Sequence, residues 1–165
     1  MDKKLPLFIV TGASGTGKST VVPYIRELLE DLDVFDIDVI QHDVEDWQKL
    51  KNIWVKVASH IAKSQRMTVL CGTMLPWEVE KCDDFQEFSK IYYVNLHCDD
   101  QTREKRLRDR GWSTELIQEH KDFAKWLIEN ADEAFDPIMP TIETTYTPIN
   151  EVALKIKEWV TKYAE

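Results

Sequence analysis

The chain has 165 residues, of which 43% are hydrophobic and 31% charged, and its formal net charge is −9. This length fits one domain with a sizeable core, and the composition is typical of a folded globular protein rather than a disordered one. The acidic balance argues against a broad nucleic-acid surface, which needs clustered Lys and Arg, and gives no reason to expect a membrane partner. It leaves room for a local positive pocket.

The three cysteines, Cys71, Cys82 and Cys98, are widely spaced. Their spacing matches neither a disulfide framework nor the paired pattern of a zinc site. We therefore expect reduced thiols and a cytoplasmic protein. The apolar run 5–10 is too short to cross a bilayer, and we expect neither a signal peptide nor a membrane-spanning helix.

Short apolar runs, typical of buried strands, alternate with stretches of helical periodicity. In chain order, strands are predicted at 5–10, 34–38, 67–71, 91–96 and 141–144, and helices at 18–32, 43–63, 101–110 and 113–130. A last helix is predicted with Thr147 as its N-cap and Pro148 as its first residue. Pro23 lies near the first turns of its helix, where a missing N–H is best tolerated. The alternation predicts one α/β domain, with a five-stranded parallel sheet covered by helices on both faces.

The most specific motif follows the first predicted strand. Residues 12–19 match the phosphate-loop pattern G-x-x-x-x-G-K-[ST] in full. In this pattern glycines let backbone N–H groups point at phosphate oxygens, Lys18 reaches the β- and γ-phosphates, and the Ser19 hydroxyl is a ligand of Mg²⁺. The motif predicts binding of ATP with Mg²⁺. The nucleotide contacts that we expect are Gly12, Ala13, Ser14, Gly15, Thr16, Gly17, Lys18, Ser19 and Thr20.

Other classes of phosphate-loop protein carry motifs that this sequence lacks. The guanine-reading N-K-x-D of GTPases and the L-S-G-G-Q of ABC ATPases are both missing. The third predicted strand also ends without the Asp that often holds the metal. A metal-positioning carboxylate must therefore come from elsewhere, and the second strand offers Asp36 and Asp38.

The early phosphate loop, the Asp-x-Asp of Asp36 and Asp38, and an arginine-rich segment after the fourth strand together resemble a small metabolite kinase. This group includes shikimate kinase, gluconate kinase and the nucleoside monophosphate kinases. Residues 142–152 are similar to the strand, polar turn and helix that close those domains. The resemblance implies a three-layer phosphate-loop NTPase fold and a phosphotransferase over 1–165. It also implies an acceptor-binding segment at about 38–65 and a short lid at about 103–115.

The resemblance implies roles for individual residues. Asp36 matches an acid near Mg²⁺, and Asp38 matches one that contacts the acceptor and takes its hydroxyl proton. Both could instead be ordinary carboxylates of an acidic turn, and which of the two is the base stays open. By family position, residues 145–150 border the base of the nucleotide.

The arginine-rich segment resembles the lid of these kinases. There, guanidinium groups stabilise the transferring phosphoryl group while closure excludes water. On a helix Arg103, Arg106 and Arg110 share a face and Arg108 points elsewhere. We expect Arg106 and Arg110 to act on the phosphates. The alternative is a solvated charged helix.

The acceptor is expected beside the ends of the second and third strands. Residues placed there are His42, Asp43, Trp47, Trp54, Gly72, Thr73, Met74 and Trp77. Trp47 and Trp54, at helical spacing, are interpreted as core residues. Cys71-Gly72-Thr73 replaces the Gly-Gly-Gly run of shikimate kinase, and the Asp-Gly pair of nucleotide kinases is missing. Shikimate is therefore disfavoured, whereas a nucleoside, a nucleotide or another hydroxyl-bearing metabolite stays open.

Three functions compete. The first is a small-molecule kinase, and the second is a nucleotide-binding regulator or weak ATPase without an acceptor. The regulator would explain the missing acid on the third strand equally well. The third, a kinase of RNA or DNA ends, is disfavoured by the charge of −9. The four histidines are scattered, so no histidine metal cluster is predicted.

Overall fold

The structure, a computed structural model, describes residues 3–164. Its centre is a sheet of five parallel strands in the order β2-β3-β1-β4-β5. The strands are β1 Leu7–Thr11, β2 Asp33–Asp36, β3 Thr68–Cys71, β4 Ile91–His97 and β5 Thr141–Glu143. The five strands that the sequence predicts are therefore found, and the predicted α/β fold class is confirmed.

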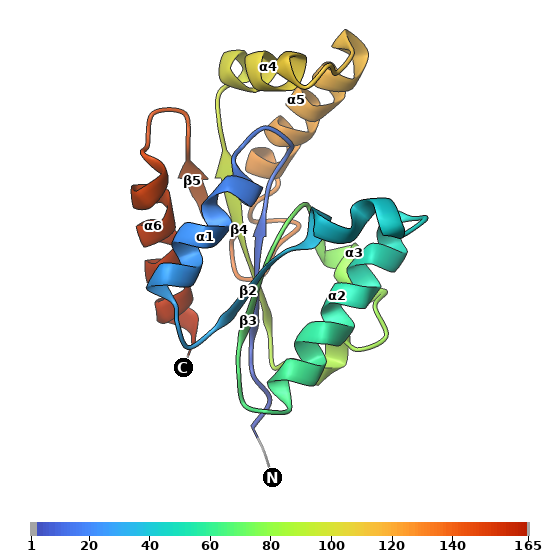
Figure 1. Ribbon diagram of the computed structural model, residues 1–165, viewed down its shortest axis with the longest axis vertical. Coiled ribbons are helices and arrows are strands. Elements are labelled where there is room, and N and C mark those ends of the chain that lie inside the picture. Colours follow the sequence, from blue (N-terminus) through green and yellow to red (C-terminus); the bar gives the residue numbers. More distant parts are fainter. Residues whose placement is uncertain (1–2, 165) are drawn as a thin grey trace.

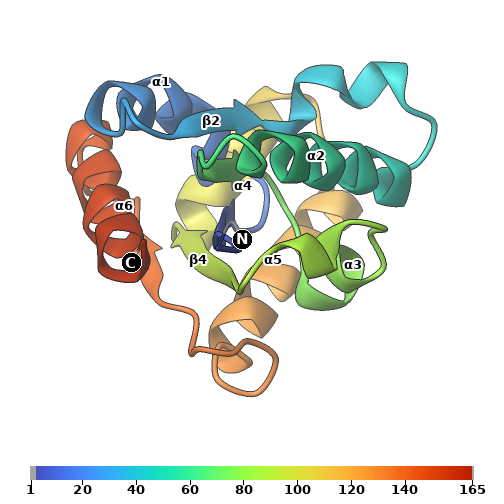
Figure 2. The ribbon, with the colours of Figure 1, turned by 90° about the horizontal axis from the view of Figure 1, so that it is seen from below.

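Helices cover both faces of this sheet, as Figures 1 and 2 show. On one face lie α1 (Lys18–Leu28) and α6 (Ile149–Tyr163), which pack on a core cluster that includes Val10, Ile25 and Ile156. The other face carries a second cluster built around Ile9, Val55 and Leu127. Its helices are α2 (Trp47–Ala62), α3 (Pro76–Glu80) and α5 (Thr114–Glu129). The result is the predicted three-layer arrangement.

The remaining helices lie at the two ends of the strands. At the carboxyl end, α4 (Asp100–Asp109) follows β4 and precedes α5 (Figure 1). Two 3₁₀ helices, η1 (Ile37–Asp43) and η2 (Phe85–Glu87), follow β2 and precede β4 respectively. Neither η2 nor the short helix α3 is predicted from the sequence. Within residues 3–164, no helix is long and apolar enough to cross a membrane.

Local capping explains why two predicted limits of strands and helices differ from the structure. The predicted strand 34–38 is wrong at its end, because the carboxylate of Asp36 accepts the Asp38 amide at 3.0 Å and starts η1. Asp38 therefore lies just beyond the sheet. The predicted helix 43–63 begins only at Trp47, after Asp46 caps it by accepting the Lys49 amide at 2.8 Å.

Two further helix limits differ from the prediction. The first helix ends at Leu28 rather than at residue 32, although it does contain Pro23. The last helix has Pro148 as its N-cap and Ile149 as its first residue, so the prediction of Thr147 and Pro148 is wrong by one position.

Gly72 joins β3 to the segment that leads towards the site. A Cβ at this position would lie 2.1 Å from Cγ1 and 2.5 Å from Cδ1 of Ile37, which is fully buried at the start of η1. We expect Gly72→Ala to lower the free energy of unfolding by about 1–3 kcal/mol, the usual cost of overpacking a core. Urea denaturation measures this loss.

Ile37→Ala removes both clashing atoms and supplies the matched control. A double-mutant cycle should show that Gly72→Ala costs less in the Ile37→Ala background than alone. Equal costs in both backgrounds would contradict the clash as the cause.

Candidate active site

The loop between β1 and α1 presents an uncapped helix end. Gly17 is the N-cap of α1, with φ of 90°, and no side chain caps the helix. Gly15 also has φ of 90°, a conformation that L side chains rarely adopt. The first amides of α1 therefore remain available to an anion, which the positive end of the helix dipole also favours.

Lys18 lies folded within this loop. Its side chain is buried, and its ammonium donates to the carbonyl of Ala13 at 2.7 Å. Burial lowers the pKa of Lys18 to about 8; the carboxylate of Asp38 opposes this shift, while Arg103 and Arg110 add to it. A bound polyanion would satisfy this partly desolvated ammonium and stabilise its charged form.

Three side chains from two other segments of the chain donate to carbonyls of the loop. The Thr73 hydroxyl, just after β3, donates to Gly12 O at 2.7 Å. From α4, Arg106 donates to Gly15 O at 2.7 Å, and Arg103 donates to Ser14 O at 2.9 Å. Because these carbonyls accept hydrogen bonds from side chains, the orientation of the loop peptides is fixed. Their N–H groups are thereby preorganised for phosphate.

The arginines of α4 divide as their spacing predicts. Arg103 is fully buried, and it also donates to Cys98 O at 2.9 Å. Arg106 and Arg110 line a cavity beside the loop. Arg108 points elsewhere and forms an ion pair with Glu104 at 2.7 Å. The solvated-helix interpretation thus fits Arg108, and the other three arginines face the loop side.

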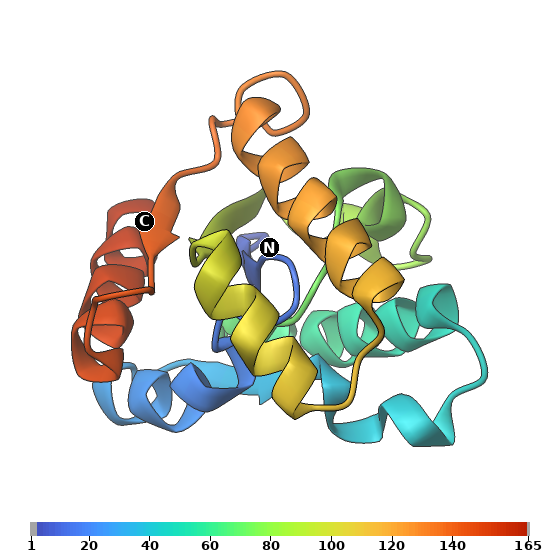
Figure 3. The same cartoon turned by 90° about the horizontal axis from the view of Figure 1, so that it is seen from above.

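This cavity, of about 410 Å³, brings three distant parts of the chain together. Seen from above, the phosphate loop lies between α4 and α5, and the β5–α6 connection lies to one side (Figure 3). The cavity is lined by Gly15, Thr16, Gly17, Thr20, Arg106, Arg110, Thr144, Thr145, Thr147, Ile149 and Val152. Its walls thus include part of the segment 145–150 that the resemblance places beside a nucleotide base.

Two acids lie where β2 ends and η1 begins: Asp36 is the last residue of β2, and Asp38 is the second residue of η1. Asp38 is partly buried, and burial raises its pKa; Asp36 adds to the rise, while Lys18 and Lys51 oppose it. The Asp36 carboxylate is already engaged in capping η1. Asp38 is therefore a carboxylate of raised basicity within electrostatic reach of Lys18.

Of the two tryptophans on the acceptor side that are interpreted as core residues, only one is buried. Trp54 is buried, and its indole N–H donates to Ile37 O at 2.9 Å. The interpretation of Trp47 as a core residue is wrong: it is the first residue of α2 and is 59% exposed. Trp77 is also exposed and packs edge-on against Trp126, with ring centroids 5.6 Å apart.

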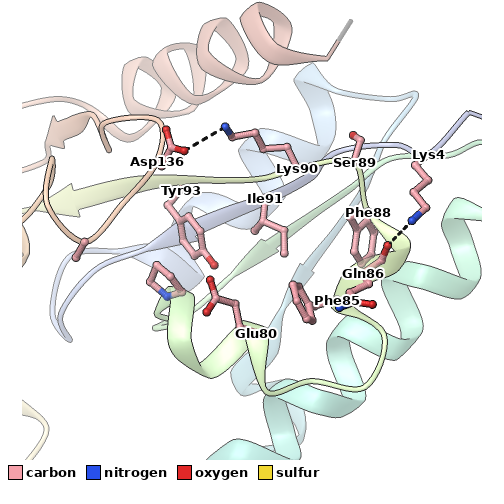
Figure 4. A pocket seen from close by; sticks show the side chains of 12 residues that line it. Lys4, Glu80, Phe85, Gln86, Phe88, Ser89, Lys90, Ile91, Tyr93 and Asp136 are labelled. Atoms are coloured by element: carbon pink, nitrogen blue, oxygen red, sulfur yellow. Dashed lines mark hydrogen bonds and ion pairs between the residues drawn. The ribbon is translucent and has the colours of Figure 1, made fainter.

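A second cavity, of about 620 Å³, lies towards the amino ends of β1 and β4 (Figure 4). Its charged groups are largely satisfied within the wall: Lys4 donates to Gln86 O at 2.7 Å, and Lys90 lies 3.6 Å from Asp136. No residue of the phosphate loop lines it. It is therefore separate from the site described above.

Two contacts of the loop come from residues to which the sequence interpretation gave no role at the site. The Cys98 thiol donates to Gly15 O at 3.5 Å, and the Ser14 amide donates to Nδ1 of His120 at 3.4 Å. His120 lies 106 positions from Ser14, on α5. No local pattern marks such a contact, because it depends on how α5 packs over the end of the sheet.

Comparison with known proteins agrees with this geometry. A family model described as an AAA domain matches residues 9–133. The adenylate kinase isoenzyme 6 homolog of Schizosaccharomyces pombe is 27% identical over 173 residues, covering 98% of this chain and 95% of that protein.

Solved structures show the same fold at low identity. A gluconokinase from Sinorhizobium meliloti has a TM-score of 0.63 at 15% identity, covering 99% of this chain and 95% of its own. The shikimate kinase of Acinetobacter baumannii has a TM-score of 0.58 at 17% identity, covering 97% and 94%. The tunicamycin resistance protein of Deinococcus radiodurans has a TM-score of 0.68 at 14% identity, covering 96% of both chains.

The interpretation of the sequence as a phosphate-loop small-molecule kinase is confirmed by this agreement between family model, relative and fold. Nucleotide binding follows from the same class. Because the family model matches most of the length of this chain, the chain belongs to the AAA domain family.

Proposed function

We propose that this protein transfers the γ-phosphoryl group of ATP to a small hydroxyl- or phosphate-bearing metabolite, with a nucleoside or nucleotide as the first class to test. The observation that carries the proposal is the geometry of the phosphate loop: Lys18 is buried within it, and Arg106 and Arg110 line the cavity beside it. Asp38, whose pKa is raised by burial, also acts electrostatically on Lys18. A kinase that acts on a hydroxyl acceptor would use this carboxylate as its base.

In the proposed reaction the cationic groups bind the phosphates and Asp38 accepts the proton. The loop amides and Lys18 hold the β- and γ-phosphates, and Arg106 and Arg110 reach the same phosphates from the adjoining cavity. For a hydroxyl acceptor, the oxygen attacks the γ-phosphorus, its proton passes to Asp38, and the bond to the β-phosphate oxygen breaks to release ADP. A phosphate acceptor is already ionised and needs no base.

Mg²⁺ fits the residues present. Among residues 3–164 no group of three or more His, Cys, Asp or Glu side chains could hold a metal by itself. Mg²⁺ is usually held by one or two protein oxygens together with nucleotide phosphates and water. Ser19, exposed in the first turn of α1, and Asp36, at the end of β2, are the proposed protein partners. The ion would neutralise phosphate charge there.

The proposal also covers the extent of the domain, its acceptor and lid segments, its compartment and its class of acceptor. Residues 1–165 act as one kinase domain, with the acceptor bound over about 38–65 and a short lid at about 103–115. Three free, buried cysteines fit a reducing compartment such as the cytoplasm. The net charge of −9 fits a small-molecule acceptor better than a nucleic acid.

One experiment tests the proposal directly. ADP release is measured with MgATP against a panel containing AMP and other nucleoside monophosphates, nucleosides, gluconate and shikimate. The name of the fission-yeast relative, an adenylate kinase homolog, puts AMP first in this panel. At least one acceptor should raise ADP release above the background ATPase rate and appear as a phosphorylated product. If no acceptor does so, the regulator or weak ATPase replaces the kinase.

The lid arginines give a second test. We expect Arg106→Ala and Arg110→Ala each to lower kcat by about 10²-fold or more, because each removes a cationic donor from the cavity beside the phosphate loop, and Arg106→Ala also removes the hydrogen bond to Gly15 O. Arg108→Ala is the matched control on the same helix, since Arg108 pairs with Glu104 on the exposed side. Steady-state kinetics measure the effect. Similar rates for all three variants would contradict the assignment of the lid face.

A further inference from the structure

His120 joins the phosphate loop to the lid. Its Nδ1 accepts the backbone N–H of Ser14, and its ring lies edge-on to Trp112, with centroids 4.9 Å apart. Trp112 lies between α4 and α5, within the predicted lid. One imidazole on α5 thus contacts a loop amide on one side and the lid turn on the other.

The contact with His120 occupies one backbone N–H group of the phosphate loop. In a phosphate loop the backbone N–H groups bind phosphate oxygens, and here the Ser14 N–H is directed to a nitrogen acceptor of the protein. An imidazole accepts at Nδ1 only in its neutral form, with its proton on Nε2. A protonated imidazole has two donors and no acceptor, and cannot hold this amide.

Burial and the charges around His120 favour its neutral form. Burial lowers the pKa of His120 below its usual value, and Lys18 of α1 and Arg103 of α4 lower it further. Glu119, on α5 itself, opposes the shift. A triphosphate bound beside Lys18 would add several negative charges, which favour the protonated imidazole.

We propose that His120 is a positioning residue for the triphosphate: neutral, it holds the Ser14 amide, and on nucleotide binding it takes up a proton, releases that amide and donates to a phosphate oxygen. The inference rests on the proposed function, because it requires a triphosphate in the loop. No covalent bond changes; one proton moves from solvent to the imidazole. Through Trp112 the same change reaches the lid turn.

The sign of the pH dependence follows from linkage. Nucleotide binding raises the pKa of His120, so the added affinity is fully present below the pKa of the free protein. It is lost as the pH rises through the pKa of the complex. Each unit by which that pKa rises corresponds to about a tenfold change in affinity across the interval.

His120→Asn separates this role from a structural one. The Asn amide oxygen lies where Nδ1 lies along the side chain, so it can still accept the Ser14 N–H, but it does not titrate. His60→Gln is the matched control, because His60 is exposed in the last turn of α2. Affinity for a non-hydrolysable ATP analogue with Mg²⁺ is measured between about pH 5.5 and 8. The nucleotide's own titration is common to all three proteins.

We expect wild type and His60→Gln to lose about tenfold more affinity than His120→Asn over this range. NMR titration of the imidazole nitrogens should show the pKa of His120 rising when the analogue is added. Identical pH profiles in wild type and His120→Asn, or an unchanged His120 pKa in the complex, would overturn the inference and leave the proposed function standing. Failure of wild type to bind the analogue at any pH would overturn both.

Discussion

Lys18→Ala is expected to lower the rate of phosphoryl transfer by at least about 10²–10³-fold, the range found when a single preorganised electrostatic group is removed. In the structure this ammonium is buried within the loop and has the carbonyl of Ala13 as its close partner. Its charge is therefore poorly satisfied until an anion binds. Removing it leaves the triphosphate without its main cationic anchor and lowers both affinity and turnover.

The measurement is ADP release together with the affinity for an ATP analogue. Lys157→Ala, on the exposed side of α6, is the control for loss of a lysine as such. It should leave both quantities within error of wild type. Unchanged activity in Lys18→Ala would contradict the entire account of the phosphate loop, including the placement of the nucleotide.

The second large effect is expected at Asp38. Asp38→Asn should lower kcat by about 10²–10⁴-fold with a hydroxyl acceptor, the usual contribution of a positioned general base, while nucleotide affinity stays close to wild type. The reason is the environment of the carboxylate. Burial and Asp36 raise its pKa, so its ionised form is a better proton acceptor than an exposed aspartate.

Asp36→Asn discriminates between the two acids. Because an Asn side chain also caps helices, Asp36→Asn should keep the cap of η1, and if Asp36 lies near the ion the change should raise the Mg²⁺ concentration needed for half-maximal rate. Asp31→Asn, at an exposed position before β2, is the control. If Asp38→Asn retains full transfer to a hydroxyl acceptor while Asp36→Asn loses it, the assignment of the base is reversed. With a phosphate acceptor, Asp38→Asn should be much less affected.

The phosphate loop shows what a local pattern can determine. Residues 12–19 must bend where glycine permits positive φ, and the helix must begin at the lysine, so pattern, backbone and chemistry are set within eight positions. The parallel sheet can also be predicted from the sequence, since strands buried on both faces appear as short apolar runs between helical segments. The spacing of Arg103, Arg106 and Arg110 likewise places all three on one face of α4.

Other features depend on partners that are distant in the sequence. The burial of Trp54 and the exposure of Trp47 could not be predicted locally, because they depend on how α2 packs in the fold. The end of β2 is different, since it depends on a local cap at Asp36 that the prediction did not include. The contacts of Thr73, Cys98 and His120 with the loop join segments separated by 61 to 106 positions. Only the folded sheet brings their chain segments to one edge.

By itself, then, the sequence determined the nucleotide loop, the fold class and the helix face that carries the arginines, because each of these depends on residues within a few turns of one another. The tertiary structure decided which groups surround that loop. It buried Lys18 near Asp38, assigned Arg103 to the loop carbonyls, and placed an imidazole against the Ser14 amide. These are matters of burial and electrostatic field, which arise only when distant segments exclude water together.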